Sequence, residues 1–130
     1  MAGSTLELTE ANFEDTLKKG EILIIDFWAA WCGPCRAFAP TFEAAAQKHG
    51  DITFAKVDTE AQRGLSAAFD IRSIPTLAVF RDGIMLTQLS GALPAPALED
   101  LISKVRAVDM NDVKAKVAAE QAKQAAQRPA

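Results

Sequence analysis

This sequence of 130 residues holds few of the residue types on which several specialised protein classes depend. It contains two cysteines, one histidine and no tyrosine. Two cysteines are too few for the disulfide framework of a small secreted domain. Two cysteines and one histidine cannot supply four zinc ligands unless a carboxylate or a second chain contributes. The counts therefore exclude a disulfide scaffold and a zinc site built from cysteine and histidine of one chain.

The charge balance and the hydropathy pattern exclude two further classes. Lys and Arg number 14 against 17 Asp and Glu, a net charge of -3, so there is no basic footprint for nucleic acid. The longest apolar run, residues 22–31, contains Asp26 and is far shorter than the ~20 residues of a membrane span. The N-terminus lacks the cationic and then apolar pattern of a signal peptide. We therefore expect a cytoplasmic protein that binds neither nucleic acid nor membrane.

What the sequence does contain is the alternation of strand and helix patterns that predicts a one-domain α/β fold. A continuous apolar run at 22–29 is typical of a central strand buried on both faces. Asp82-Gly83 between apolar runs predicts a hairpin. The expected strands are 5–8, 22–29, 53–58, 74–80 and 85–90, and the expected helices are 9–19, 34–48, 62–69 and 94–108.

The last twenty residues differ in character from the rest of the chain. They are rich in alanine and glutamine, and Val113 and Val117 are the main members of a thin apolar stripe. An isolated helix of this length has little stability of its own. Two interpretations stay open: a solvated, partly frayed helix, or a helix that docks on a partner.

Both cysteines lie in one segment, Cys32-Gly33-Pro34-Cys35, between a predicted buried strand and a predicted helix. In the first turn of a helix, residues three apart are neighbours, so the two sulfurs can close a disulfide ring. Cys32 would lie where free backbone N–H groups and the helix dipole stabilise a thiolate. Cys35 shares a stripe with apolar side chains and is expected to be more buried. We interpret Cys32 as the attacking thiol and Cys35 as the resolving thiol of disulfide exchange.

Three other residues bear on this chemistry. Asp26 interrupts the apolar strand, where desolvation would raise its pKa and let it accept the Cys35 proton. Lys56, in the next strand, is within reach of Asp26; a merely structural Asp26 is an equal alternative at this point. Pro75 opens a strand, a tolerated position, and the ~5–6% frequency of cis X–Pro bonds favours a trans bond.

These motifs resemble the thioredoxin family over roughly residues 6–108. Trp31-Cys32-Gly33-Pro34-Cys35 is similar to that family's active-site motif, Ile74-Pro75-Thr76 to its proline segment, and Gly91-Ala92 to its substrate-groove glycine. The resemblance implies a thioredoxin fold in residues 1–108, a central mixed sheet flanked by four helices, with 109–130 as a helical C-terminal extension. It also implies a cis Pro75 facing the cysteines.

The resemblance further implies a function for each site residue. The chain would be a protein-disulfide reductase without a cofactor of its own, a monomer re-reduced by NADPH through thioredoxin reductase. Asp26, with Lys56 beside it, would be the proton acceptor, and the Ile74 backbone would bind an extended segment of disulfide-containing protein substrates as an added strand. The flat apolar surface for these partners would comprise Trp31, Gly33, Pro34, Ile74, Pro75, Gly91 and Ala92.

Some features depart from the family pattern, and two other functions compete. Ser90 stands before Gly91 where an apolar residue is common, and Pro94 and Pro96 replace a Ser/Thr helix cap, which puts partner preference in doubt. The enzymatic alternative is a disulfide oxidant or isomerase, which a reduction potential would separate from a reductase. The non-enzymatic alternative is a scaffold that binds partners through the groove or the C-terminal extension.

Overall fold

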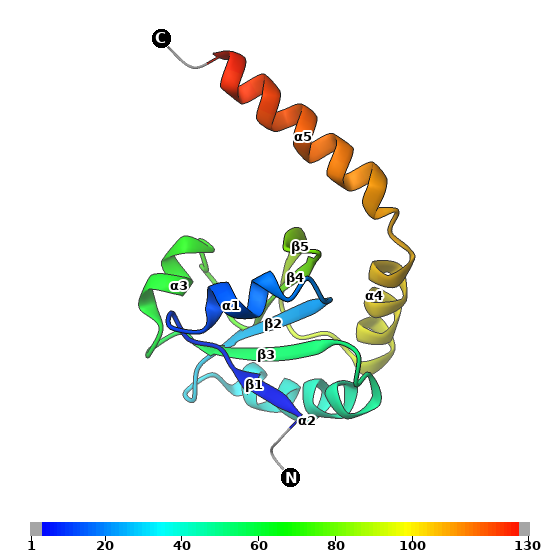
Figure 1. Ribbon diagram of the computed structural model, residues 1–130. Coiled ribbons are helices and arrows are strands. Elements are labelled where there is room, and N and C mark those ends of the chain that lie inside the picture. The colour runs from blue at the N-terminus through cyan, green and yellow to red at the C-terminus, as the bar shows by residue number, and fades with distance from the viewer. Residues whose placement is uncertain (1–3, 128–130) are drawn as a thin grey trace.

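A five-stranded mixed sheet forms the centre of the computed structural model, which describes residues 4–127 (Figure 1). The order across the sheet is β1-β3-β2-β4-β5. Strand β3 runs parallel to β1 and β2, and β4 runs antiparallel to β2 and β5. The strands are β1 Thr5–Glu7, β2 Leu23–Trp28, β3 Thr53–Asp58, β4 Thr76–Arg81 and β5 Ile84–Ser90. The predicted α/β class and mixed sheet are confirmed.

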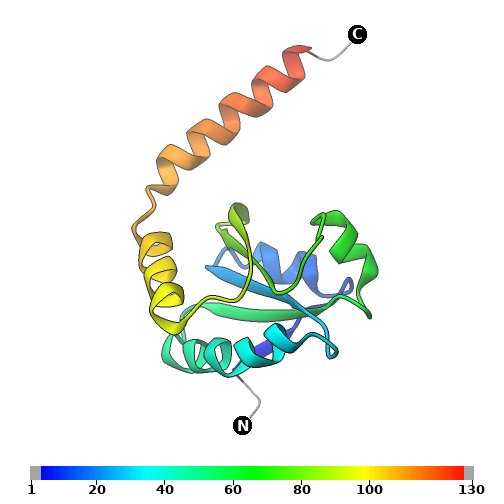
Figure 2. The same ribbon diagram turned by 180° about the vertical axis from the view of Figure 1, so that it is seen from behind.

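Four helices cover the two faces of the sheet, as predicted (Figure 2). Apolar side chains of α2 and α4 pack on one face, and those of α1 and α3 pack on the other. The helices are α1 Phe13–Lys18, α2 Gly33–Lys48, α3 Arg63–Ala68 and α4 Ala95–Ala107. Most boundaries differ from the prediction by one or two residues. Strand β4 begins at Thr76 rather than at Ile74, because Pro75 has no N–H to donate to the sheet.

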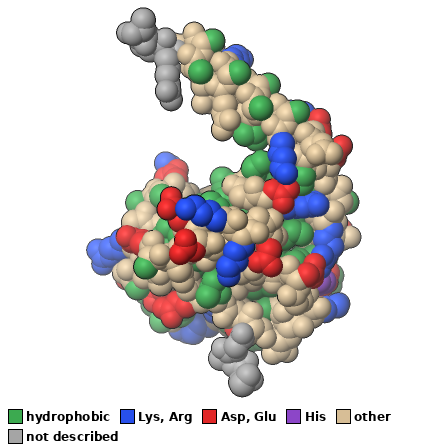
Figure 3. All heavy atoms as spheres, in the orientation of Figure 1, with side chains coloured by type: hydrophobic (Ala, Val, Ile, Leu, Met, Phe, Trp, Pro, Cys, Tyr) green, Lys and Arg blue, Asp and Glu red, His purple; other side chains and the backbone are tan. Residues whose placement is uncertain are grey.

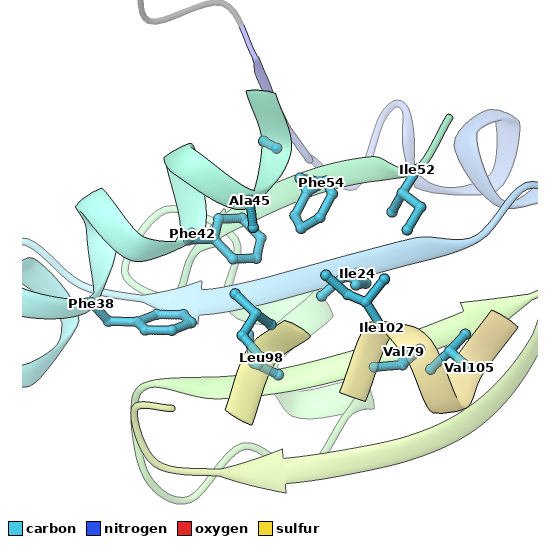
Figure 4. Packing of buried hydrophobic residues seen from close by; sticks show 12 residues of the cluster. Ile24, Phe38, Phe42, Ala45, Ile52, Phe54, Val79, Leu98, Ile102 and Val105 are labelled. Atoms are coloured by element: carbon cyan, nitrogen blue, oxygen red, sulfur yellow. The ribbon is translucent and has the colours of Figure 1, made fainter. Parts of the chain in front are cut away.

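The continuous apolar run of the central strand is explained by burial on both faces. Ile24 packs with Phe42 and Leu98 on the face covered by α2 and α4 (Figure 4). Ile25, one residue on, packs in the cluster of the opposite face. Because side chains alternate along a strand, Asp26 lies on the same face as Ile24, beneath α2. The fold therefore places one carboxyl group in the layer between the sheet and α2.

The tight turn between β4 and β5 is the predicted Asp-Gly hairpin. Asp82 and Gly83 have φ angles of 54° and 76°, the left-handed values that a two-residue type I′ turn needs at both positions. The hairpin brings Arg81 next to the end of α4 and Asp82 next to Lys114, beyond that helix.

The C-terminal extension is a helix, α5, Met110–Gln127, that leaves the domain beyond the end of α4 (Figures 1 and 3). Met110 is buried at its start, Val113 and Val117 are half-buried, and Lys114 forms an ion pair of 3.2 Å with Asp82. The helix meets the hairpin only in its first part. The extension expected at 109–130 is thus helical up to Gln127, and residues 128–130, like residues 1–3, lie outside the described part. Within residues 4–127, no helix is long and apolar enough to cross a membrane.

Arg81 joins the hairpin to the junction between α4 and α5. Its Nη1 donates to the carbonyl oxygens of Val105, Arg106 and Val108 at 2.9, 3.2 and 3.1 Å. These carbonyls lie at the negative end of the α4 dipole, where only Val105 also accepts a backbone N–H, that of Val108 at 3.4 Å, so the guanidinium caps the helix.

Replacement of Arg81 by methionine is expected to lower the free energy of unfolding by about 1.5–3 kcal/mol, the range for hydrogen bonds to a charged group. Urea unfolding monitored by circular dichroism measures the change. The matched control is Arg72→Met, since Arg72 is exposed and pairs only with exposed Asp70, a contact of about 0–1 kcal/mol. Equal losses in the two variants would contradict the capping role of Arg81.

Candidate active site

Cys32 and Cys35 form a disulfide where the chain turns from β2 into α2, with their Cα atoms 5.2 Å apart. Cys32 is the N-cap residue of α2, with an extended backbone at φ -87° and ψ 111°. Its sulfur accepts a hydrogen bond of 3.2 Å from the backbone N–H of Cys35 and lies 3.7 Å from the carbonyl oxygen of Ile74. Pro34 occupies the first turn, where a missing N–H costs nothing. A thiolate on Cys32 would be stabilised both by this N–H and by the positive end of the helix dipole.

The disulfide lies in a small apolar cluster. Cys32 and Cys35 are 4% and 2% exposed and pack against Ala29, Trp28 and Ile74. The predicted order of burial holds, but the difference between the two cysteines is slight in the disulfide form. A partner must therefore approach from the outer side of Cys32, where the chain is open.

A groove of about 600 Å³ lies on that open side. Trp31 forms one wall and is 68% exposed, which is unusual for so large an apolar side chain. Three segments far apart in the sequence line the groove: residues 31–34, residues 59, 60 and 66 near α3, and residues 71–74 before β4. The groove has apolar walls around Cys32 and polar groups, among them Thr59 and Arg72, at its side.

The structure brings most, but not all, of the predicted binding residues to the groove. Trp31, Gly33, Pro34 and Ile74 line it together with Cys32. Gly91 does not line the groove. Its N–H donates to the carbonyl oxygen of Pro75 at 2.7 Å, and Pro75 directly follows the groove residue Ile74, so Gly91 lies beside the groove. Ala92 is exposed next to Gly91 and is not among the groove residues.

The Ile74–Pro75 peptide bond is cis. The expectation from the general frequency of cis bonds is wrong here, and the expectation from the family resemblance is confirmed. Pro75 is buried at the start of β4, and Ile74 directly before it presents its carbonyl oxygen to Cys32. The proline segment and the cysteine pair thus face each other, although they are some forty residues apart in the sequence.

Asp26 is the one fully buried carboxyl group of residues 4–127, and neither of its oxygens has a hydrogen-bond partner there. Burial raises the pKa of Asp26 to about 7, and the nearby charge of Lys56 opposes this rise. Lys56 is the register partner of Asp26 on β3. A carboxyl group that titrates near neutral pH, on the strand that leads into the cysteine turn, can exchange a proton during catalysis.

Trp28 contacts the site in a way that no motif of the sequence predicts. The Lys56 ammonium lies over its ring, 4.7 Å from the ring centroid. The carbonyl oxygen of Trp28 accepts hydrogen bonds from the N–H and the hydroxyl of Thr59, at 2.9 and 3.0 Å. The alternation of side chains along a strand could have indicated this contact, since Trp28 lies two residues after Asp26 and therefore on the same face of the sheet. Elsewhere in residues 4–127, no group of three or more histidine, cysteine or acidic side chains is placed to hold a metal ion.

A cysteine pair at the start of a helix, a cis-proline segment facing it and an open groove beside it define a protein-disulfide oxidoreductase. Comparison with known proteins gives the family: the thioredoxin family model matches residues 4–125, and the chain belongs to the thioredoxin family. The predicted thioredoxin fold is thereby confirmed.

Individual relatives agree with this assignment. "Putative thioredoxin 2" of Streptomyces coelicolor is 50% identical over 119 residues, which cover 92% of this chain and 89% of that protein. A thioredoxin of Coprinus comatus is 46% identical over 95 residues, 72% of this chain and 89% of that protein. The solved structure of Plasmodium falciparum thioredoxin superposes with a TM-score of 0.71 at 33% identity, covering 77% of this chain and 97% of that one. The family model and the Streptomyces match both extend beyond residue 108.

Proposed function

We propose that this chain is a general protein-disulfide reductase. The observation that carries the proposal is the Cys32–Cys35 disulfide at the helix start, next to the Ile74 carbonyl and the exposed Trp31. In this arrangement the Cys32 sulfur can react with a partner, while the Cys35 sulfur remains buried behind it. The same pair supports exchange in either direction, so the direction itself is part of the proposal.

The reaction proceeds in two exchange steps. The Cys32 thiolate attacks one sulfur of the target disulfide, which forms a mixed disulfide and releases the other target sulfur as a thiolate. Cys35, having given its proton to Asp26, attacks Cys32; the Cys32–Cys35 bond forms and the second target thiolate leaves. Two electrons have passed from the cysteine pair to the target. Lys56, beside Asp26, favours the ionised carboxylate and so the later release of the proton.

Protein substrates would bind as an extended segment along the outer side of the cysteine pair. The backbone of Ile74 would pair with this segment like an added strand, and Trp31, Gly33 and Pro34 would cover its apolar side chains. Pro75 would hold the Ile74 backbone in place, and Gly91 and Ala92 would border the segment on the side of β5. Ser90 and Arg72 add polar groups near this surface, which would favour partners with matching polar side chains.

The proposal includes the electron donor and the cellular setting. A thioredoxin reductase would return two electrons from NADPH to the Cys32–Cys35 disulfide, and the chain would act as a monomer in the cytoplasm. A reduction potential below about -220 mV supports this direction, whereas a potential near -120 mV would indicate a disulfide oxidant. Equilibration with a glutathione redox buffer measures it.

We also propose that the catalytic domain is residues 1–108 and that 109–130 is an extension. Deletion of residues 111–130, which keeps the buried Met110, should leave insulin reduction within about twofold of the full chain, because the described residues of α5 line neither the groove nor the disulfide. The turbidity of reduced insulin measures the rate. Loss of a bound protein partner with retained reduction would assign the extension to docking, and a tenfold loss of reduction would contradict the proposed boundary.

A further inference from the structure

The Lys56 ammonium has four possible partners on one face of the sheet. On the neighbouring strands β2 and β3, Asp26 is the register partner of Lys56, and Trp28 is the register partner of Asp58. Glu7 on β1 is the other register partner of Lys56. Side chains of register partners project to the same face, so these groups are neighbours beneath α2. Within residues 4–127 the ammonium forms no ion pair with any of the three carboxylates and lies over the Trp28 ring.

A pocket of about 300 Å³ opens beside this group at the edge of the sheet. It is lined by Thr5, Leu6, Glu7, Trp28, Lys56 and Asp58. Asp26 is not among the lining residues and is fully buried. Lys56 therefore stands between the buried carboxyl group and the pocket, and two carboxylates of the pocket compete for its charge.

Trp28 is held firmly enough to act as a support. Its side chain packs in the cluster of Ala29, Cys32 and Cys35, and its carbonyl oxygen accepts both hydrogen bonds of Thr59. An ammonium over an indole face is attracted by the negative face of the ring, more strongly where water is displaced. The ring thus offers the ammonium a binding partner other than the three carboxylates.

We propose that Trp28 is a positioning residue whose ring holds the Lys56 ammonium beside Asp26, against the pull of water, Glu7 and Asp58 in the pocket. The proposal rests on the proton-acceptor role of Asp26 in the proposed function. A cation kept beside Asp26 favours its ionised form, which promotes release of the proton that Asp26 takes from Cys35. Without the ring the ammonium turns to the pocket, and Asp26 holds its proton longer.

The charged groups that face Asp26 and Lys56 are few and come from known elements. Glu7 comes from β1 and Lys56 and Asp58 from β3, while Glu43 of α2 lies at the pocket, where its Oε1 accepts the Thr5 hydroxyl at 2.8 Å. One oxygen of the Asp58 carboxylate already has hydrogen-bond donors, because Oδ1 accepts the N–H groups of Glu60 and Ala61 at 2.9 and 3.4 Å. Strand β4, on the other side of β2, places the apolar Leu77 opposite Asp26. A change in the titration of Asp26 can therefore be traced to Lys56 by a double-mutant cycle.

The test is the titration of the Asp26 carboxyl carbon by NMR in the disulfide form of the full chain. It compares the wild type, Trp28→Leu, Lys56→Gln and the double variant. Loss of the Lys56 charge should raise the pKa of Asp26 above about 7. Trp28→Leu should raise the pKa of Asp26 by about half a unit more when Lys56 is present than in the Lys56→Gln background. This is the size expected when a unit charge moves a few ångströms away at an effective dielectric constant of about 20.

The cycle separates the charge of Lys56 from the entry of water, which Trp28→Leu alone does not. Equal shifts in the two backgrounds would mean that Trp28 only shields Asp26 from water, and a relative fall in the pKa would mean that the ring holds the ammonium away from Asp26; either result overturns the proposal. Trp28→Phe keeps a ring and should give a smaller difference of the same sign, and it replaces Trp28→Leu in the cycle if the leucine variant does not fold.

The readout is also independent of the proposed reductase activity. No substrate is present in the titration, so a chain that fails to reduce insulin can still show the coupling. Conversely, a chain that reduces insulin normally but shows no coupling retains the proposed function and loses this inference.

Discussion

Replacement of Cys32 by serine should reduce the rate of insulin reduction at least about 10³-fold, to the background rate of the reductant alone. A serine hydroxyl is not ionised at neutral pH and cannot form a mixed disulfide, so the first exchange step is lost. The N–H of Cys35 and the helix dipole, which stabilise a Cys32 thiolate, give no comparable help to a neutral hydroxyl. Turbidity of reduced insulin with dithiothreitol as the electron donor measures the rate.

Cys35→Ser is the matched variant, because it removes the other sulfur of the same disulfide. It should keep the first step and lose the second, so it should accumulate mixed disulfides between Cys32 and its targets. Mass spectrometry after non-reducing electrophoresis detects these adducts, and reductant releases them. A Cys32→Ser variant as active as the wild type, or adducts formed equally by both variants, would contradict the division of roles between the two sulfurs.

The sequence predicts the elements that depend on local patterns. The apolar run around Asp26 places the central strand, and the position of Cys32-Gly33-Pro34-Cys35 between that run and a helix predicts the disulfide that the structure contains. The Asp82-Gly83 turn is likewise local, since both residues tolerate positive φ. In each case a few neighbouring residues fix the geometry.

Other features depend on contacts between segments that are distant in the sequence. Nothing in residues near Pro75 fixes its isomer, so a general frequency points to the wrong one and only the family resemblance corrects it. Arg81 donates to three carbonyl oxygens that lie 24–27 residues further along the sequence, and no sequence motif predicts these contacts. The alternation that predicts a Lys56–Asp26 pair is correct about the face, but packing decides that the ammonium lies over Trp28.

Asp26 links the stability of the folded chain to pH in a direction opposite to that of most carboxyl groups. Its pKa is raised from 3.8 to about 7, so the folded state binds a proton that the unfolded state has already released between these values. Stability is therefore highest below about pH 4 with respect to this group, falls as the pH rises, and reaches its full loss above about pH 7. A difference of about three pKa units corresponds to about 4 kcal/mol.

The isosteric variant Asp26→Asn removes this dependence while it keeps the shape of the side chain. In urea unfolding of the disulfide form, it should be more stable than the wild type by about 4 kcal/mol at pH 9, with the advantage nearly constant down to about pH 7 and shrinking from there towards pH 5. Asp51→Asn is the control, because Asp51 is exposed and its ion pair with Arg106 lowers the pKa of its carboxyl to about 2. The difference in free energy of unfolding between Asp51→Asn and the wild type should not change between pH 5 and pH 9. A constant difference between Asp26→Asn and the wild type across this interval would mean that Asp26 does not titrate there.

The same substitution should act in the opposite direction on catalysis. Asp26→Asn cannot accept the proton of Cys35, so closure of the disulfide should slow by about 10²-fold or more near pH 7, the usual range for loss of a general base. Stopped-flow measurement of tryptophan fluorescence follows this step, since Trp28 packs against the cluster that contains both cysteines. A variant that is more stable at neutral pH and slower in the second exchange step would show that the buried, unpartnered carboxyl group destabilises the fold and serves the reaction. Greater stability with an unchanged rate would leave Asp26 without a part in proton transfer.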